Sequence, residues 1–364
     1  MVFIALFPYI GLLLLTLLIP QFVNNKKRYM VFLFLVFFIF SGFRYGVGWD
    51  FFNYLHIIEF GGLGIDNFEF LVRQLGYFCE RHGFTQFFFV ATSFFIVLGF
   101  FLMFAKESEN PAVSIFVFLC IPTFLLNSFT IIRYFLAVSA IFLSCHYGYK
   151  KQYVPYFLLL IAAFLCHKAA LFGLITIPFV LLKKEFGFTT NLTIFITCFV
   201  FGTIIGSFSF ISSMFNTLLE SALFSDSDIL ESGERYMQDI GNANFSRTPY
   251  VFALINLINL FSFRRNNQIE SEQLLGHYVT MYNIGCSLMF LFSFHVTFAN
   301  RVSVLFTVFL TLIAPFYKNK PIAKIALYSI CLFVFFFELT IRASHIDFVG
   351  RLNCWLPYRM NLSF

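Results

Sequence analysis

The sequence has little charge. Aspartate, glutamate, lysine and arginine make up 12% of its 364 residues, about half the share of a typical soluble domain. Hydrophobic residues make up 60%, and phenylalanine alone occurs 60 times. Uncharged runs such as residues 1–23 and 191–210 reach the roughly 20 residues that a helix needs to cross a bilayer. This composition excludes a soluble globular protein and predicts a polytopic integral membrane protein.

The sequence also lacks patterns that would indicate other kinds of site. Its 8 cysteines are scattered, mostly within apolar runs, and show neither a CxxC pair nor the Cys–His spacing of a zinc site. Residues 1–22 have neither the basic start nor the small-residue cleavage site of a signal peptide. We find no internal repeat and no soluble domain. We therefore expect one polytopic membrane domain over residues 1–364, with no metal, no cofactor and no nucleic-acid partner.

Lysine and arginine concentrate in five clusters, and such residues are enriched in the cytoplasmic loops of membrane proteins. The clusters are residues 26–28, 150–151, 183–184, 264–265 and 318–324. When all five clusters and Lys106 are placed in the cytoplasm, ten of the 11 lysines lie there, and Lys168 is the exception. The apolar runs between the clusters then predict an all-α protein with about 10–12 transmembrane helices.

This topology leaves two larger segments on the external face, residues 44–83 and 211–247. Residues 211–247 carry six acidic residues against two arginines. Within them, Asp226 and Asp228 have the spelling of a DxD metal motif, but the surrounding loop is acidic and rich in serine, so we expect no metal there. We expect this loop to recognise the acceptor, because loops on a rigid scaffold commonly carry specificity.

Interruptions and periodicity within the apolar runs predict three further features. His167 and Lys168 interrupt residues 151–182, which predicts two short helices meeting there, or a broken re-entrant pair, with both ends in the cytoplasm. A helix is expected to start at Pro111 with Asn110 as its N-cap, and the chain to turn near residues 127–128. Apolar residues at helical spacing within residues 61–83 predict an interfacial helix (Phe68, Leu71, Val72, Leu75 and Phe78).

Four cations from separate parts of the chain are expected on the external face at similar depth. They are Arg44, Arg133, Lys168 and Arg301. Polar residues within spans usually face a cavity and mark a substrate path. Guanidinium groups bind phosphate oxygens in bidentate fashion and lysine adds a point charge, so the expected anion at that depth is a lipid pyrophosphate.

Each of these residues also has a purely structural interpretation. The arginines could anchor helix ends at lipid phosphates, since long basic side chains reach from a helix end to the interface. Asp50 could pair only with Arg44. Gly46 and Gly48 could merely permit a turn, or could allow backbone amides to approach an anion.

The residues around Arg44 and Arg133 resemble those of a known family. "FRYGVGWDFFNY" (residues 43–54) is similar to the R-Y-x-V-G-x-D-[YF]-x-N-Y signature of the EpsG-type branch of bacterial polysaccharide polymerases, the class that includes Wzy O-antigen polymerases. Residues 128–175 resemble the family's second block, in which an arginine starts a helix and a later helix ends in His-x-[SA]-A. Arg301 looks like its third conserved arginine. The chain departs from the family at Tyr134, where relatives commonly carry glutamine, and at Ala169, where serine is common.

The resemblance implies a GT-C-like glycosyltransferase in the bacterial inner membrane. Such enzymes join oligosaccharide repeat units carried on undecaprenyl pyrophosphate at the periplasmic face and release undecaprenyl pyrophosphate. It implies Arg133 and Arg301 at the pyrophosphate, assisted by Arg44 and Lys168. His167 is the first choice as base for the incoming hydroxyl and Asp50 the second. Further implied contacts are substrate binding by Asn53 and Tyr54, membrane lipid, and a chain-length regulator protein as partner.

Three other functions remain open from the sequence. A flippase for lipid-linked oligosaccharides would tend to show internal repeats and charges at the membrane midplane. A sugar O-acetyltransferase would need a path from the cytoplasm for its acyl carrier. An O-antigen ligase shares the polymerase chemistry and differs mainly in its acceptor. The match of residues 43–54 favours the polymerase.

Overall fold

The computed structural model describes residues 2–61, 63–182, 185–207, 248–264, 270–293, 296–342 and 354–361. These residues are almost entirely helical, and within these ranges there is no β-strand beyond one isolated bridge between Arg44 and Met360. The prediction of an all-α polytopic membrane protein is confirmed. The segment 211–247, with Asp226 and Asp228, lies outside the described residues.

Four described helical stretches are long and apolar enough to cross a membrane: Ala5–Phe22, Thr85–Glu107, Phe298–Asn319 and Pro321–Thr340. Five further apolar helices are shorter than a full crossing. The predicted total of about 10–12 transmembrane helices stays a prediction.

The chain divides into two compact units, residues 1–184 with 310–364 and residues 185–309, and each is described by itself. The first unit contains α1 (Val2–Phe22), α2 (Lys26–Gly42), α3 (Phe51–Phe60), α4 (Leu63–Asp66), α5 (Phe70–His82), α6 (Thr85–Glu107), α7 (Pro111–Cys120), α8 (Leu125–Thr130), α9 (Ile132–Tyr149), α10 (Tyr153–Cys166), η1 (Lys168–Ile175), α11 (Thr176–Leu182), α18 (Leu310–Ile313), η2 (Ala314–Asn319), α19 (Pro321–Phe337) and η3 (Glu338–Arg342). Whether both units form a single membrane domain stays a prediction.

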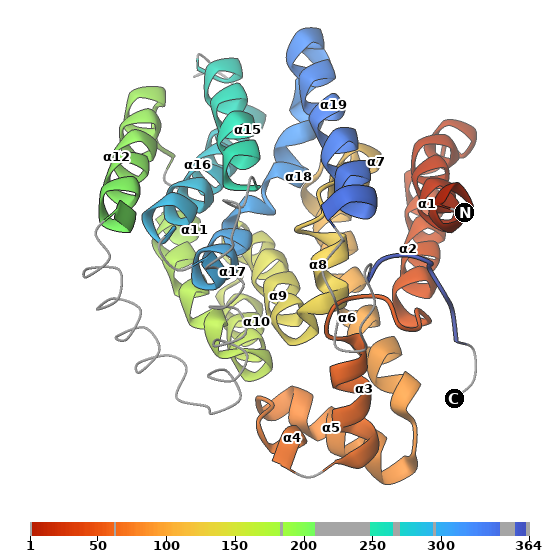
Figure 1. Ribbon diagram of the computed structural model, residues 1–364. Coiled ribbons are helices and arrows are strands. Elements are labelled where there is room, and N and C mark those ends of the chain that lie inside the picture. The colour runs from red at the N-terminus through yellow and green to blue at the C-terminus, as the bar shows by residue number, and fades with distance from the viewer. Residues whose placement is uncertain are drawn as a thin grey trace. The chain divides into compact units, whose positions relative to one another are not determined.

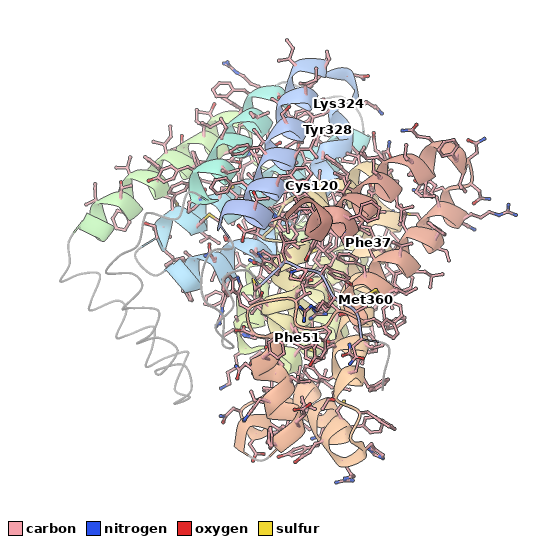
Figure 2. The ribbon with its side chains drawn as sticks, turned by 45° about the vertical axis from the view of Figure 1, so that its right-hand side comes forward. Phe37, Phe51, Cys120, Lys324, Tyr328 and Met360 are labelled. Carbon is pink, nitrogen blue, oxygen red and sulfur yellow. The ribbon has the colours of Figure 1, made fainter. Side chains whose placement is uncertain are left out.

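Phenylalanine fills the core of the first unit. The rings of Phe100 on α6 and Phe118 on α7 lie 4.4 Å apart between centroids, and those of Phe37 and Phe101 lie 5.4 Å apart. Figure 2 labels Phe37 within this packing. Such pairs contribute about 0.5–1.5 kcal/mol each beyond burial. Aromatic packing of this kind suits a membrane protein, because lipid tails offer no hydrophobic driving force between helices.

The N-terminal ends of α2 and α7 follow the sequence signals for helix starts in part. Asn25 caps α2, and its side chain accepts a hydrogen bond from the backbone N–H of Arg28 at 3.2 Å. Asn110 and Pro111 start α7 as predicted, although the Asn110 side chain makes no capping hydrogen bond. The predicted turn near residues 127–128 is wrong. Those residues are helical within α8, and the chain turns at Ile131 between α8 and α9.

The predicted break at His167 and Lys168 is confirmed. Helix α10 ends at Cys166, His167 is extended with φ −162° and ψ 130°, and η1 begins at Lys168. The chain then returns along its own path, because the hydroxyls of Tyr156 and Thr176 lie 3.2 Å apart. With its 14 residues α10 extends about 21 Å, less than the roughly 30 Å of a hydrocarbon core.

A second predicted helix, within residues 61–83, is also present. It is α5, which packs with α3 and α4 beyond the ends of α6 and α9 (Figure 1). Of the residues in its predicted apolar stripe, Phe68 and Val72 are buried, whereas Leu71 and Phe78 are exposed. Gly76 and Cys79 complete the buried face of α5. Because Gly76 has no side chain, the side chain of Ile65 can approach the helix closely.

Residues 354–361, called here the C-terminal strap, pair with the loop that follows α2. Tyr45 N–H donates to Arg359 O at 2.8 Å, Asn361 N–H donates to Phe43 O at 2.8 Å, and Gly48 N–H donates to Cys354 O at 3.0 Å. The bridge residue Met360 is labelled in Figure 2. The strap is anchored to α1 and α2 by Tyr9, which donates to Trp355 O at 2.9 Å, and by Tyr358, whose ring stacks on Phe40 at 4.2 Å.

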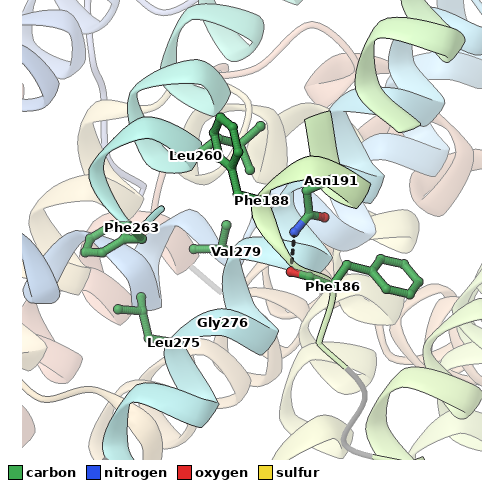
Figure 3. Close-up of a pocket in the computed structure, with 8 residues that line it drawn as sticks. All are labelled: Phe186, Phe188, Asn191, Leu260, Phe263, Leu275, Gly276 and Val279. Carbon is green, nitrogen blue, oxygen red and sulfur yellow. Dashed lines mark hydrogen bonds between the residues drawn. The ribbon is translucent and has the colours of Figure 1, made fainter. Parts of the chain in front are cut away.

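The second unit contains α12 (Phe188–Ser207), α15 (Thr248–Ser262), α16 (Glu270–Leu291) and α17 (Val296–Thr307). Three buried asparagines connect three of these helices. Asn256 Nδ2 donates to Asn283 Oδ1 at 2.8 Å, and Asn283 Nδ2 donates to Asn191 Oδ1 at 3.1 Å. Asn191 also donates to Phe186 O at 2.8 Å beside a small pocket (Figure 3).

Candidate functional site

The loop of residues 43–50 owes its conformation to two glycines. Gly46 has φ +65° and Gly48 has φ +106°, a region that side chains rarely adopt. A Cβ on Gly48 would also lie 2.5 Å from Phe129 O. The backbone N–H groups of Tyr45, Gly48 and Trp49 donate to protein oxygens, Trp49 to Thr130 Oγ1 at 3.2 Å. These three amides are therefore engaged within the protein, which favours the turn interpretation of the glycines.

Arg44 is inside the protein. Only 1% of the residue is exposed, and its guanidinium donates to Ser93 Oγ at 3.0 Å, to Phe129 O at 3.3 Å and to Ser41 O. The rings of Phe89 and Phe129 lie 5.5 and 4.7 Å from the guanidinium carbon, within cation–π range. In this conformation Arg44 connects α2, α6 and α8. Its predicted assistance to pyrophosphate binding stays a prediction.

Arg133, at the start of α9, lies against the segment between α4 and α5. Its Nη1 donates to Glu69 Oε2 at 2.9 Å and to Asn67 O at 3.3 Å, and the ring of Phe68 lies 4.8 Å from its guanidinium carbon. Its guanidinium also donates to the hydroxyl of Tyr54. One quarter of the Arg133 side chain (25%) remains exposed. Unlike Arg44, it is therefore accessible to an anion from outside.

Glu69 connects the side chain of Arg133 with the backbone of Lys168. It is the residue before α5, and its side chain is 11% exposed. One carboxylate oxygen accepts from Arg133, and the other accepts from the backbone N–H of Lys168 at 3.2 Å. Sequence reasoning missed this role because Glu69 looks like one polar residue of an amphipathic helix. No local pattern relates it to Arg133 or Lys168.

His167 and Lys168 lie in the break after α10. His167 is 7% exposed, and its Nδ1 accepts from the N–H of Ala169 at 3.0 Å. Its ring makes an edge contact with Tyr134 at 5.5 Å between centroids. With Nδ1 as acceptor, a neutral imidazole carries its proton on Nε2. This tautomer is assigned from the hydrogen bond.

Asp50, Asn53 and Tyr54 belong to the start of α3. Asp50 is the N-cap residue of α3 and is half-buried, Asn53 is exposed, and Tyr54 is buried. Burial raises the pKa of the Tyr54 hydroxyl, while the neighbouring Arg133 opposes this shift and Asp50 adds to it. Tyr54 thus connects the 43–54 motif with Arg133.

The first unit therefore brings together four of the eight residues predicted for the site. Tyr54, Arg133, His167 and Lys168 come from α3, α9 and the break after α10. Arg133 donates to Tyr54 and to Glu69, and Glu69 also accepts from the backbone N–H of Lys168, the residue after His167. We call the group formed by these five residues the outer cluster. Arg301 is in α17 of the second unit, so its predicted place beside Arg133 stays a prediction.

The outer cluster has the groups needed to bind a phosphorylated substrate. A partly exposed guanidinium and a backbone N–H donate to one carboxylate, and that N–H belongs to an exposed lysine that follows a buried histidine. Preset cations of this kind stabilise negative charge on a leaving group without reorganising during the reaction. A buried tyrosine and a half-buried aspartate lie at the edge that α3 contributes.

Comparison with known proteins gives one match. The EpsG family profile matches residues 27–360, which covers both the 43–54 motif and the outer cluster. No curated protein and no solved structure matched the chain. The match extends over most of the chain and agrees with its all-helical, multi-pass character. The chain therefore belongs to the EpsG family, the family of Wzy-type polysaccharide polymerases.

Proposed function

We propose that the chain polymerises O-antigen-type repeat units in the bacterial inner membrane. The substrates would be oligosaccharides linked to undecaprenyl pyrophosphate, and the outer cluster would face the periplasm. The observation that carries this proposal is the convergence of Arg133, His167 and Lys168 in a member of a polysaccharide polymerase family.

The reaction would exchange one bond to the anomeric carbon for another. A hydroxyl oxygen of the incoming unit attacks C1 of the reducing-end sugar of the growing chain. The bond between C1 and the pyrophosphate oxygen breaks, and undecaprenyl pyrophosphate leaves with the bonding electrons. The hydroxyl proton passes to a base, so atoms and charges balance.

Arg133 and Lys168 would bind the pyrophosphate, and Arg301 would assist them. Asp50 would accept the hydroxyl proton, because a carboxylate that is half-buried beside Tyr54 remains within reach of a substrate. His167, whose Nδ1 already accepts a hydrogen bond, would donate from Nε2 to a substrate oxygen. This assignment differs from the sequence-based expectation, which places His167 first and Asp50 second as the base.

A surface-polysaccharide ladder on a gel tests the proposal. The source strain without the gene would be complemented with wild type, Arg133→Ala, His167→Ala or the control Lys106→Ala. Lys106 is exposed in the last turn of α6, so its loss removes a charge without touching the outer cluster. We expect the deletion to leave lipid core with a single repeat unit, and only the Arg133 and His167 variants to fail in restoring the ladder.

A different result would favour another function. If the deletion removes every repeat unit from the surface, export or ligation is the better interpretation. If Arg133→Ala restores a full ladder while its expression matches wild type, the outer cluster is not the site of polymerisation.

A further inference from the structure

Two donors from separate elements converge on the carboxylate of Glu69. Arg133 Nη1, on α9, donates to one oxygen at 2.9 Å. The backbone N–H of Lys168, at the start of η1, donates to the other at 3.2 Å. The two donors are therefore placed to bind the paired oxygens of one anion, and in this structure the anion is a side chain of the protein itself.

A phosphate group presents the same chemistry as this carboxylate. Both carry paired anionic oxygens, and guanidinium binds both in bidentate fashion. The guanidinium of Arg133 also has unused capacity. Its Nε is buried and makes no hydrogen bond with any described residue, although 25% of the side chain is exposed. An anion richer in oxygen atoms than a carboxylate would satisfy it better.

We propose that Glu69 is a displaceable counter-ion of the enzyme. It occupies the anion site formed by Arg133 and the Lys168 N–H when no substrate is present, and the pyrophosphate of the lipid-linked donor takes its place. This inference rests on the proposed function and names the group that regulates its site.

The exchange keeps the guanidinium of Arg133 paired in both states. Leaving a mostly buried charge without a partner is costly, and breaking such a pair destabilises a protein strongly. A carboxylate and a pyrophosphate repel each other, so they do not occupy the same donors together. After transfer, the return of Glu69 competes with bound undecaprenyl pyrophosphate and promotes its release.

Glu69 is consequently a positioning residue that acts through Arg133. Replacing it with glutamine removes the competing charge and keeps the shape of the side chain. We expect Glu69→Gln to bind a pyrophosphate probe about tenfold more tightly, within the range usual for coupling between two ligands of one site. In the polymerisation assay we expect a lower KM and a lower kcat, because the product also leaves more slowly.

The test is calorimetric titration of the purified full-length protein in nanodiscs with inorganic pyrophosphate. Wild type would be compared with Glu69→Gln, Glu69→Asp, Arg133→Ala and Glu59→Gln. Glu59, exposed on α3, is the matched control because it carries the same charge change on the same external helices. Glu69→Asp keeps the charge on a shorter side chain that cannot reach both donors, and we expect an intermediate affinity. Farnesyl pyrophosphate is expected to compete with the inorganic probe if the site takes a lipid-linked anion.

The outcomes separate this inference from the proposed function. If Arg133→Ala binds pyrophosphate as well as wild type does, the anion site itself is misplaced and the proposed roles fail. If Arg133→Ala loses binding but Glu69→Gln binds no more tightly than Glu59→Gln, the site stands and the counter-ion inference is overturned. Thermal unfolding of each variant identifies any that is not folded. If Glu69→Gln is not folded, the pyrophosphate affinities of Glu69→Asp and wild type are compared instead. A tighter affinity of Glu69→Asp supports the inference, and an equal affinity overturns it.

Discussion

Arg44 and Gly48 belong to the motif that identifies the family, yet both are buried by contacts with other parts of the protein. Arg44 connects three helices through carbonyl and hydroxyl oxygens, and Gly48 allows α8 to approach the loop closely. Residues of such a motif can thus be needed to maintain the local conformation of the protein, and not only to bind a substrate. Tyr54 and Asp50, from the same motif, are the residues that extend to the outer cluster.

The glycine requirement at position 48 is directly testable. Gly48→Ala introduces a Cβ at a positive φ and 2.5 Å from Phe129 O, so we expect a loss of about 2–4 kcal/mol in stability. Thermal unfolding of the purified protein in detergent measures it. The control is Gly11→Ala on α1, where no atom lies within 4 Å of the new Cβ and the change should be neutral or slightly stabilising. Equal unfolding temperatures for both variants would contradict the structural role of Gly48.

The sequence identified single residues of the site better than it identified their partners. Arg133, His167 and Lys168 were recognisable because a cation or histidine within an apolar run is costly and usually functional. Tyr54 was recognisable only through the resemblance of residues 43–54 to the family motif. Glu69 was not recognisable, because a carboxylate at the start of an amphipathic helix has an ordinary explanation in water. The pairing depends on how residues 67–69, between α4 and α5, lie against α9 and on how α5 packs against α10, which no local pattern contains.

Among the helices, the break after α10 was predictable and the position of the turn before α9 was not. A histidine and a lysine in the middle of an apolar run are difficult to place in one continuous helix, so the break followed from charge. The turn at Ile131 has no proline, glycine or charge to mark it. It depends on packing, since Phe129 O accepts a hydrogen bond from Arg44, which lies 85 residues away in the chain.

In the second unit, the three buried asparagines should stabilise the packing of α12, α15 and α16. Asn283→Leu conserves side-chain volume but removes the hydrogen bonds to Asn191 and from Asn256, so we expect a loss of about 1–2 kcal/mol. The unfolding midpoint in detergent measures this effect. Thr203→Val is the control, because the exposed Thr203 hydroxyl donates to Phe199 O and Val200 O within its own helix. A midpoint shift no larger than that of the control would contradict a stabilising role for the asparagines.

At the scale of the whole first unit, the contacts sort the ends of the helices into two groups. Lys318 pairs with Glu109 at 2.9 Å, and Val180 packs at Gly148, which brings the predicted cytoplasmic ends together in two places. The strap meets the loop after α2, so Arg44 and Met360 lie at the same level. The pairing fits the topology predicted from the basic clusters if an even number of membrane crossings separates the loop from the strap, and that topology stays a prediction.

Cysteine labelling tests this arrangement. Asn53→Cys and Arg359→Cys replace exposed residues, and both are expected to react with a membrane-impermeant maleimide from the same side of the membrane. Lys324→Cys, at the exposed start of α19, is expected to react only from the opposite side. The maleimide labelling of each variant is compared with that of the unsubstituted protein. Labelling of Asn53→Cys and Arg359→Cys from opposite sides would show that the pairing between strap and loop is wrong.

The strap also determines when the enzyme becomes complete during its synthesis. The loop after α2 is among the first parts to enter the membrane, but its hydrogen-bond partners at Cys354 and Arg359 leave the ribosome about 310 residues later. Contacts of such separation form late, after the intervening helices have been inserted. A nascent or prematurely terminated chain would therefore carry the family motif without its final conformation. The cell would receive a working site only from chains that have been translated through to residue 361.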